Sequence, residues 1–507
     1  MAVSSPRPGA PAEPAGPSGP GLRRTLSVWQ AVGLSVALMA PSMAANINPQ
    51  GTAGTVGRAV PLAFLLAAVG VLLVAYGFVR LCQYFHHAGS VYAFVGATLG
   101  ARAGLVSGLG LFGTYCFYGV VTSTAAGIFG TDFLAAVGVW PDPPSWAPFV
   151  LAGLALLGAL ALTIVPARRG TDVLLSVEGA TVALILVISA IVLVRLLAGD
   201  APAGQTFTWS VFSVPRGTDA SALFLGVVFG FLSFAGFEAA ATLGEEARNP
   251  RRDIPRAILG TAVFGGVYFT VVTAIEVMGF GADDAGVARF IASGSLLGDL
   301  GRDYIAGWVG DLITVGAAIS AFGCCLACTV GASRLAYAFA RDLRREGAPP
   351  TGLAATTRAG TPGTAAVLVV AVMAVIALVL ALAGGGQPFE VFLWSGTIGT
   401  LILLVAYVLT TIGAIRLVFV ERRMPAVPRW QVVVPVLALV VLGYTLYRNV
   451  VPFPSPSDGA PFWNPVVAAA WLATCVVAVL AAPAAAHRAG AALTAAELGA
   501  RREAGAR

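Results

Sequence analysis

The chain has 507 residues, of which 58% are hydrophobic and only 11% charged, and its formal net charge is +6. This composition lies far outside the range of soluble domains, so it argues against a soluble enzyme or a nucleic-acid-binding domain. Apolar runs long enough to cross a hydrocarbon core of about 30 Å recur along the chain, which predicts an all-α integral membrane protein.

Residues 1–27 are rich in proline, glycine and alanine and have no apolar segment before Arg23 and Arg24. We expect a disordered cytoplasmic tail there, because this composition forms no core and lacks the pattern of a cleavable signal peptide. A transmembrane domain is predicted at 28–482, followed by a second cytoplasmic tail at 483–507.

About twelve apolar segments follow one another, each with the length of a membrane-spanning helix. With the N-terminus inside, this number of spans places most arginines in cytoplasmic loops, where basic residues accumulate because they resist translocation. We therefore expect both termini to be cytoplasmic and the protein to lie in the plasma (inner) membrane. The predicted spans are Trp29–Asn46, Val60–Gln83, Ala103–Phe133, Ala147–Val165, Leu174–Leu197, Ala222–Leu243, Ile258–Gly281, Ile305–Ala340, Thr364–Ala383, Phe389–Arg416, Val432–Tyr447 and Pro465–Ala482.

Two spans carry a helix-breaking residue in their apolar part. Pro41 in the first span lacks an amide hydrogen and clashes with the preceding turn, so the helix is expected to kink or unwind around Ala40–Ala44. Gly236 weakens the sixth span, and Glu238 places a carboxyl group within the same apolar run. Each residue alone has a common structural explanation, but unsatisfied backbone in lipid is retained only where it lines a cavity or packs on protein.

The two broken spans are the first and the sixth, which run in opposite directions. This placement is typical of an inverted repeat of five plus five helices, with a solute site where the broken helices meet. We predict repeat one at about 28–198, repeat two at about 220–418 and two extra helices at about 430–482. The amide ends of half-helices suit a carboxylate and freed carbonyls suit an ammonium group, so the pair fits a zwitterion.

Several motifs occur in a fixed order along the chain: Ala88–Tyr92, Phe234–Glu238, Glu245–Ile258, Ala332–Asp342 and Gly360–Pro362. In these motifs the chain resembles the amino acid-polyamine-organocation superfamily of permeases, and the resemblance extends from about residue 25 to the twelfth span. It implies a LeuT-like bundle of ten core helices plus two that works by alternating access. A secondary transporter of an amino acid or a related small amine is the function expected from it.

The resemblance also implies where a solute would bind. The first helix departs from many relatives, which carry a Gly-Ser-Gly segment where this chain has Pro41–Ala44, so carboxylate capture is less secure and the solute could be an amine. Each aromatic side chain alone is more commonly a packing residue. The expected substrate-binding residues are Ala40, Pro41, Ser42, Met43, Ala44, Tyr115, Tyr118, Phe234, Ala235, Gly236, Phe237 and Trp394.

Three glutamates lie within predicted spans: Glu178, Glu238 and Glu276. A buried carboxyl group is costly when charged, so these residues are candidates for carrying a coupling proton. Some proton-coupled relatives place a lysine in the fifth helix, and this chain contains none. Glu178 and Glu276 could instead be solvated near the interfaces, and a sodium site would use hydroxyls such as that of Ser320, so proton and sodium coupling both remain open.

Arginines on two inner loops, including Arg248 beside Glu245 and Glu246 on one loop and Arg334 on the other, could form ion pairs that close an inward gate, or could serve only as a topology signal. The six cysteines are expected to be small packing residues without a metal, and no cofactor is expected. A membrane enzyme is disfavoured because the chain lacks a nucleotide-binding glycine loop and a metal-ligand spacing. A channel, a polyamine or organic-cation exchanger and a transporter-like sensor remain alternatives, and the oligomeric state is left open.

Overall fold

The structure is a computed structural model. It describes residues 28–85, 90–165, 168–243, 247, 249–342, 352–357, 360–424, 426–484 and 486–491, and these residues form helices and connecting segments without a strand. The predicted tail at 1–27 and most of the tail at 483–507 lie outside the described residues. So do Glu245, Glu246 and Arg248 of the predicted inner gate.

The described residues contain ten helical runs that are long and apolar enough to cross a membrane. One run, Ala31–Tyr84, covers two predicted spans, and the predicted sixth span has a shorter apolar helix, Ala220–Phe234. Counting Ala31–Tyr84 as two crossings and adding Ala220–Phe234 gives the twelve crossings predicted from the sequence, of which the first and the sixth are interrupted. The crossing helices are α1 (Val28–Met39), α2 (Pro41–Val56), α3 (Val60–Tyr84), α5 (Ala101–Ala136), α6 (Ala147–Ile164), α7 (Arg168–Ala198), α8 (Leu223–Phe234), α9 (Pro250–Phe280), α12 (Gly307–Asp342), α13 (Gly363–Ala383), α14 (Pro388–Ile415), α15 (Val433–Arg448) and α16 (Ala460–Ala481).

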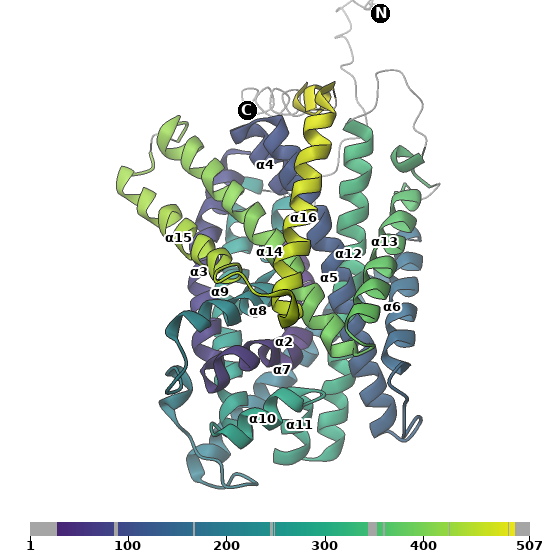
Figure 1. Ribbon diagram of the computed structural model, residues 1–507, viewed down its shortest axis with the longest axis vertical. Coiled ribbons are helices and arrows are strands. Elements are labelled where there is room, and N and C mark those ends of the chain that lie inside the picture. Colours follow the sequence, from purple (N-terminus) through teal and green to yellow (C-terminus); the bar gives the residue numbers. More distant parts are fainter. Residues whose placement is uncertain are drawn as a thin grey trace, which may run out of the picture.

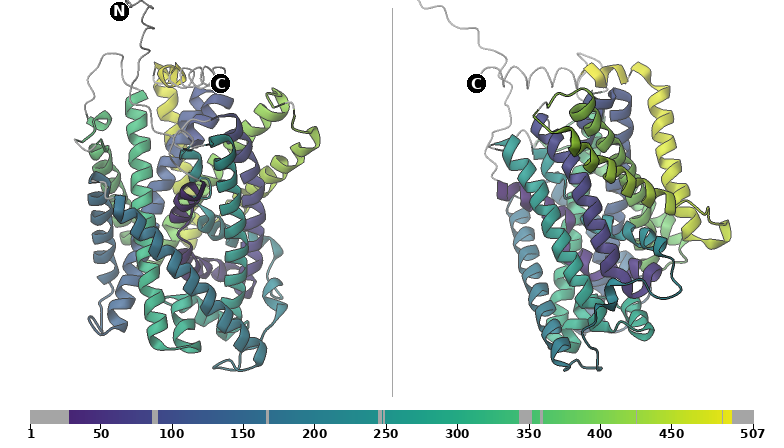
Figure 2. Two further views of the ribbon diagram at one scale, coloured as in Figure 1. Left: turned by 180° about the vertical axis from the view of Figure 1, so that it is seen from behind. Right: turned by 90° about the vertical axis from the view of Figure 1, so that its left-hand side faces the viewer.

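The crossing helices form one bundle whose long axis is vertical in Figure 1. The short helix α4 (Ser90–Leu99) lies at one end, and α10 (Asp284–Ala292) and α11 (Leu296–Tyr304) lie at the other. The last two crossing helices, α15 and α16, pack on the outside of α14 (Figure 2). The core is therefore built by the ten preceding spans.

Helices at corresponding positions of the two predicted repeats pack against each other. The second span (α3) packs on the seventh (α9), and the third span (α5) packs on the eighth (α12). The broken spans cross-pair, since α2 contacts α8 while α1 contacts the short 3₁₀ helix η4 (Ala239–Leu243). An inverted repeat gives such pairs where equivalent helices lie next to its two-fold axis in the membrane plane.

The first span extends further than the sequence suggested. It was predicted to end at Asn46, but α2 continues to Val56, and Asn46, Asn48 and Gln50 are buried. The Asn46 side-chain oxygen accepts hydrogen bonds from the Ser295 hydroxyl at 2.9 Å and from the Leu297 amide at 3.0 Å. The Asn48 amide nitrogen donates to the Ser233 hydroxyl at 2.7 Å and the Gln50 amide nitrogen to the Phe290 carbonyl at 3.1 Å, so this polar segment is buried against tertiary partners.

Close approach of helices depends on small residues. A methyl group added at Gly104 of α5 would lie 2.6 Å from the Gly96 Cα atom of α4, a distance that two carbon atoms do not tolerate. Small residues allow backbones to approach in this way where apolar lipid gives no hydrophobic drive for helix association. The six cysteines are buried and unpaired, and the described residues contain no group of three or more potential metal ligands.

Candidate functional site

The first helix break lies between α1 and α2. Ala40 adopts a left-handed conformation, with φ 44° and ψ 59°, and Pro41 begins α2. Proline disfavours a helical conformation in the residue before it and is well tolerated in the first position of a new helix. The sequence Ala40-Pro41 therefore ends one helix and starts the next, as predicted.

The first amides of α2 all have partners. The Ser42 amide donates to the Glu178 carboxyl group at 2.9 Å, the Met43 amide donates to the Ser320 hydroxyl at 3.2 Å, and the Ala44 amide donates to the Ala40 carbonyl at 2.8 Å. Pro41 has no amide hydrogen to offer. The sequence suggested an amide end open to a solute carboxylate, but in this structure the protein's own side chains fill it.

Glu178 and Ser320 reach this break from two different helices, α7 and α12. Their side chains are buried, with 5% and 6% of their surface exposed. The alternative in which Glu178 is solvated near the inner interface is therefore excluded. On the other side of the break, the Tyr268 hydroxyl of α9 donates to the Pro41 carbonyl at 3.3 Å, so three helices hold the broken segment.

The second break follows α8. Helix α8 ends at Phe234, and Gly236 has φ 104°, a region that glycine occupies far more readily than other residues. The Glu238 carboxyl group accepts a hydrogen bond from the Gly236 amide at 3.2 Å and another from the Tyr407 hydroxyl of α14 at 3.0 Å. A glutamate therefore binds a backbone amide at each helix break.

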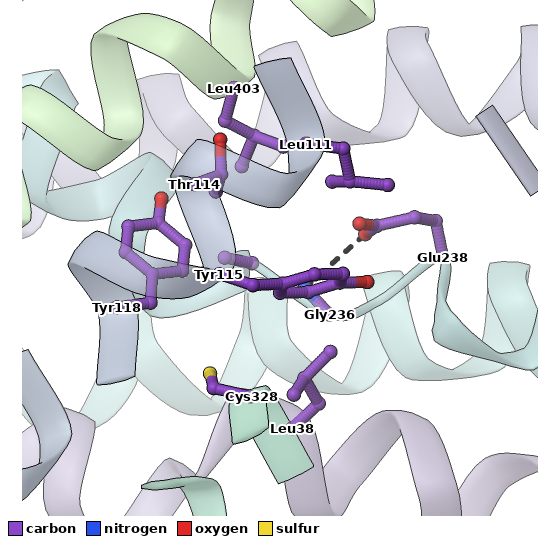
Figure 3. A pocket seen from close by; sticks show the side chains of 10 residues that line it. Leu38, Leu111, Thr114, Tyr115, Tyr118, Gly236, Glu238, Cys328 and Leu403 are labelled. Carbon is purple, nitrogen blue, oxygen red and sulfur yellow. Dashed lines mark hydrogen bonds between the residues drawn. The ribbon is translucent and has the colours of Figure 1, made fainter. Parts of the chain in front are cut away.

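A small cavity lies between the second break and the facing helices (Figure 3). Its volume is about 10 Å³, near the minimum that holds one water molecule. The carboxyl group of Glu238 and the ring of Tyr115 lie next to each other in it. This conformation is closed around the cavity. The lining residues are Leu38, Leu111, Thr114, Tyr115, Tyr118, Ala235, Gly236, Glu238, Cys328 and Leu403.

Helix α12 connects the two breaks. Its Ser320 accepts the Met43 amide, and its Cys324 donates to the Leu38 carbonyl with a sulfur-to-oxygen distance of 3.0 Å. Leu38 in turn packs against Gly236, since a Cβ atom on that glycine would lie 2.7 Å from the Leu38 Cβ atom. Residues four apart in a helix are separated by about one turn, or about 6 Å along its axis. Ser320 and Cys324 are therefore one helical turn apart, so one short stretch of α12 contacts the first break directly and reaches the second break through Leu38.

Several predicted site residues lie at this centre and others do not. Tyr115, Tyr118, Ala235, Gly236 and Glu238 line the cavity, and Ser42 and Met43 bind Glu178 and Ser320. By contrast, the Trp394 indole donates to Glu390 on its own helix at 2.9 Å and is not among the lining residues. The rings of Phe234 and Phe237 pack in aromatic clusters with Phe269 and with Phe78 and Tyr407 respectively, so they serve the core.

The remaining candidates lie away from the cavity. Glu276 of α9 has no exposed surface, and both of its carboxyl oxygens lack a hydrogen-bond partner in the described structure. A solvated position for Glu276 is thereby excluded. Arg334 is exposed on α12, and its predicted gate partners Glu245 and Glu246 fall outside the described residues.

Sequence reasoning missed Tyr407, whose hydroxyl binds Glu238 across 169 positions of the chain. Its side chain is almost fully buried in α14 among Phe78 and Phe237. A tyrosine in an apolar span needs a partner for its hydroxyl. The position of Tyr407 in an apolar span therefore indicated that its hydroxyl is bonded, but it did not identify Glu238 as the partner.

A sequence model of the family described as amino acid permease matches residues 30–488. Among curated proteins, the chain is 28% identical over 329 residues to the low-affinity putrescine importer PlaP of Escherichia coli K12, covering 63% of this chain and 68% of the relative. It is 28% identical over 293 residues to the branched-chain amino acid permease BcaP of Bacillus subtilis, covering 57% and 61%. Over 400 residues it is 24% identical to BcaP of Lactococcus lactis, covering 77% and 81%.

Proposed function

This chain belongs to the amino acid permease family, and we propose that it moves an amino acid or a related small amine across the plasma membrane, coupled to protons. This membership confirms the family resemblance seen in the sequence motifs, and it also confirms the LeuT-like fold predicted from that resemblance. The protein is a multi-pass membrane protein and a secondary transporter, not an enzyme. Both termini are placed in the cytoplasm in this proposal, as the arginine distribution indicates.

The observation that carries the proposed solute class is the charge of the cavity. Its described lining residues carry one carboxyl group, that of Glu238, and no basic group. A buried carboxylate without a basic partner attracts either a proton or an ammonium group. The relatives are a putrescine importer and a branched-chain amino acid permease, and both kinds of solute carry a protonated amino group. We therefore place the solute's ammonium group next to Glu238.

Proton coupling rests on the three buried glutamates. None of the ion pairs among the described residues includes Glu178, Glu238 or Glu276. Such groups change their protonation state readily when a neighbouring charge arrives or leaves. A sodium site would need several hydroxyl and carbonyl oxygens around one point, whereas the Ser320 hydroxyl lies beside the Glu178 carboxyl group and accepts the Met43 amide. These contacts favour a proton over sodium as the coupling ion.

The first experiment is uptake into proteoliposomes of a panel of labelled amino acids and diamines, with an imposed pH gradient, a sodium gradient or neither. We expect one solute class to accumulate under an inward proton gradient and not under the sodium gradient alone. Protein-free liposomes with the same gradients are the control. Accumulation driven by sodium alone would contradict the proton proposal, and exchange against an internal amine without any gradient would favour the polyamine or organic-cation exchanger.

The Tyr407 hydroxyl gives a narrower test of Glu238. Changing Tyr407→Phe removes the 3.0 Å hydrogen bond to Glu238, and a bond to a charged group is worth about 1.5–3 kcal/mol. We expect the KM for the transported solute to rise about tenfold, because Glu238 loses a group that orients it. Initial uptake rates over a range of solute concentrations measure this effect.

Tyr118→Phe is the matched control. Tyr118 also lines the cavity, but its hydroxyl is paired with the uncharged Thr400 hydroxyl at 2.9 Å. A hydrogen bond between two neutral groups contributes about 1 kcal/mol to the free energy of the folded state, less than a bond to a charged group. The KM for the solute is therefore expected to change less than in Tyr407→Phe. Equal effects of the two substitutions would mean that Tyr407 does not act through Glu238.

A further inference from the structure

The amide end of α2 is the natural place for a negatively charged group of the solute. The first amides of a helix lack partners within the helix, and the helix dipole adds partial positive charge there. For these reasons helix N-termini bind carboxylates and phosphates. A solute with an α-carboxylate would place it at Ser42 and Met43 if these amides were free.

In this protein a carboxylate is already present at that end. Glu178 lies 136 positions after Ser42 and comes from a different helix, yet one of its carboxyl oxygens accepts the Ser42 amide at 2.9 Å. Ser320 takes the next amide, that of Met43, at 3.2 Å, and Ser320 also lies beside the Glu178 carboxyl group. Since the Ala44 amide binds the Ala40 carbonyl, the first turn has no amide left for a solute.

Electrostatic repulsion is a second reason why a solute carboxylate would not bind here. The other charged or titratable groups near the break are Tyr268 of α9, whose hydroxyl binds the Pro41 carbonyl, and Glu276 on the same helix. The second break, which reaches α12 through Leu38 and Cys324, carries Glu238. A solute carboxylate at α2 would therefore meet carboxyl groups of the protein and no basic side chain among the described neighbours. Like charges at such short range in a low-dielectric site are strongly unfavourable.

We propose that Glu178 occupies the position of a solute carboxylate at the amide end of α2 and thereby makes the transporter select amines without an α-carboxylate over the corresponding amino acids. This inference rests on the proposed function, in which the solute's ammonium group binds next to Glu238. Glu178 is then a specificity-determining residue. Its carboxyl group binds the amide end of α2 in place of a solute carboxylate. The solute then needs only an ammonium group for Glu238 and a remainder that is either apolar or carries a second amine.

A pair of solutes that differ only in the α-carboxylate tests the proposal. Putrescine is ornithine without its carboxyl group, and 3-methylbutylamine is leucine without its carboxyl group. The measured quantity is the ratio of kcat/KM for the amine to kcat/KM for its amino acid, in proteoliposomes containing the full chain. We expect the wild-type protein to favour the amine at least tenfold in one of the two pairs.

Two substitutions at Glu178 change the ratio in different ways. Glu178→Ala removes both the charge and the acceptor, which frees the Ser42 amide, so the ratio should fall about tenfold toward the amino acid. Glu178→Gln retains an oxygen that accepts the Ser42 amide but has no charge, so it should produce a smaller fall. The control is Glu390→Gln, which removes a carboxyl group that binds the Trp394 indole away from the cavity and should leave the ratio unchanged.

Folding is monitored by thermal unfolding in detergent. For a variant that folds but does not transport, the ratio of the two solutes' affinities is measured by the thermal stabilisation that each provides. A wild-type preference for the amino acid, or an unchanged ratio in Glu178→Ala, would overturn the role of Glu178. Failure of the proposed function looks different, because the wild-type protein would then neither take up nor be stabilised by either member of each pair.

Discussion

Glu238→Gln is expected to lower kcat/KM for the transported amine at least about 100-fold. Breaking a buried ionic contact by removing one charge costs about 3–5 kcal/mol, and each 1.4 kcal/mol corresponds to about a factor of ten. The substitution is nearly isosteric, and the Gln oxygen can still accept the Gly236 amide and the Tyr407 hydroxyl that Glu238 now binds. The backbone of the break is therefore expected to survive while the charge is lost.

The uptake assay should compare a cationic amine and a neutral amino acid in the same variant. Abolished amine uptake with amino acid uptake only slowed would indicate a direct contact between Glu238 and the solute's ammonium group. Glu390→Gln is a suitable control, because Glu390 lies on α14 and binds the Trp394 indole away from the cavity. Unchanged uptake of both solutes in Glu238→Gln would remove this residue from solute binding and from coupling.

The second large effect is expected at Gly236. Gly236→Val should abolish transport and lower the thermal unfolding temperature in detergent. The residue has φ 104°, and an added Cβ atom would lie 2.7 Å from the Leu38 Cβ atom and 3.1 Å from the Leu38 carbonyl carbon. A non-glycine residue in such a conformation costs about 1–3 kcal/mol before any clash is counted. The substitution would also push α1 away from the second break. The contact between Leu38 and Gly236, which now forms one wall of the cavity, would then be lost.

Gly260→Ala is the matched control for this substitution. Gly260 lies in the helical, exposed part of α9, and an added methyl group would meet no atom within 4 Å. Alanine is favoured over glycine in a helix by about 1 kcal/mol, so the unfolding temperature should stay the same or rise and uptake should be normal. Full transport activity in Gly236→Val would show that the close contact between Gly236 and Leu38 is not needed for the transport cycle.

The two helix breaks are stabilised in a similar way by different residues. At the first break, the fifth span supplies Glu178 to a backbone amide of the first span. At the second break, Glu238 of the sixth span binds its own broken segment, and the tenth span supplies Tyr407 to hold that carboxyl group. The fifth and tenth spans are equivalent helices in the predicted repeat. Both breaks thus have a carboxyl group at an amide and a supporting helix at the same place in the repeat.

The sequence by itself determined the class of protein, the number of crossings and the places where two of them break. These properties depend on neighbouring residues, since apolar length sets a membrane span and Pro41 or Gly236 interrupts a helix within one turn. The sequence also singled out Glu238 as a carboxyl group in the broken segment, and the family resemblance implied Tyr115 and Tyr118; all three line the cavity.

Only the tertiary structure decided what each break is bonded to. Glu178 reaches Ser42 across 136 positions and Tyr407 reaches Glu238 across 169, and the rotation of each helix about its axis decides such contacts. In these uniformly apolar spans the helical pattern does not define a single inward face, so the sequence could not show that Trp394 lies off the cavity. Its bond to Glu390, four positions earlier on the same helix, is a local contact. The filled amide end of α2, on which solute selection is proposed to depend, exists only because three separate helices meet at Pro41–Ala44.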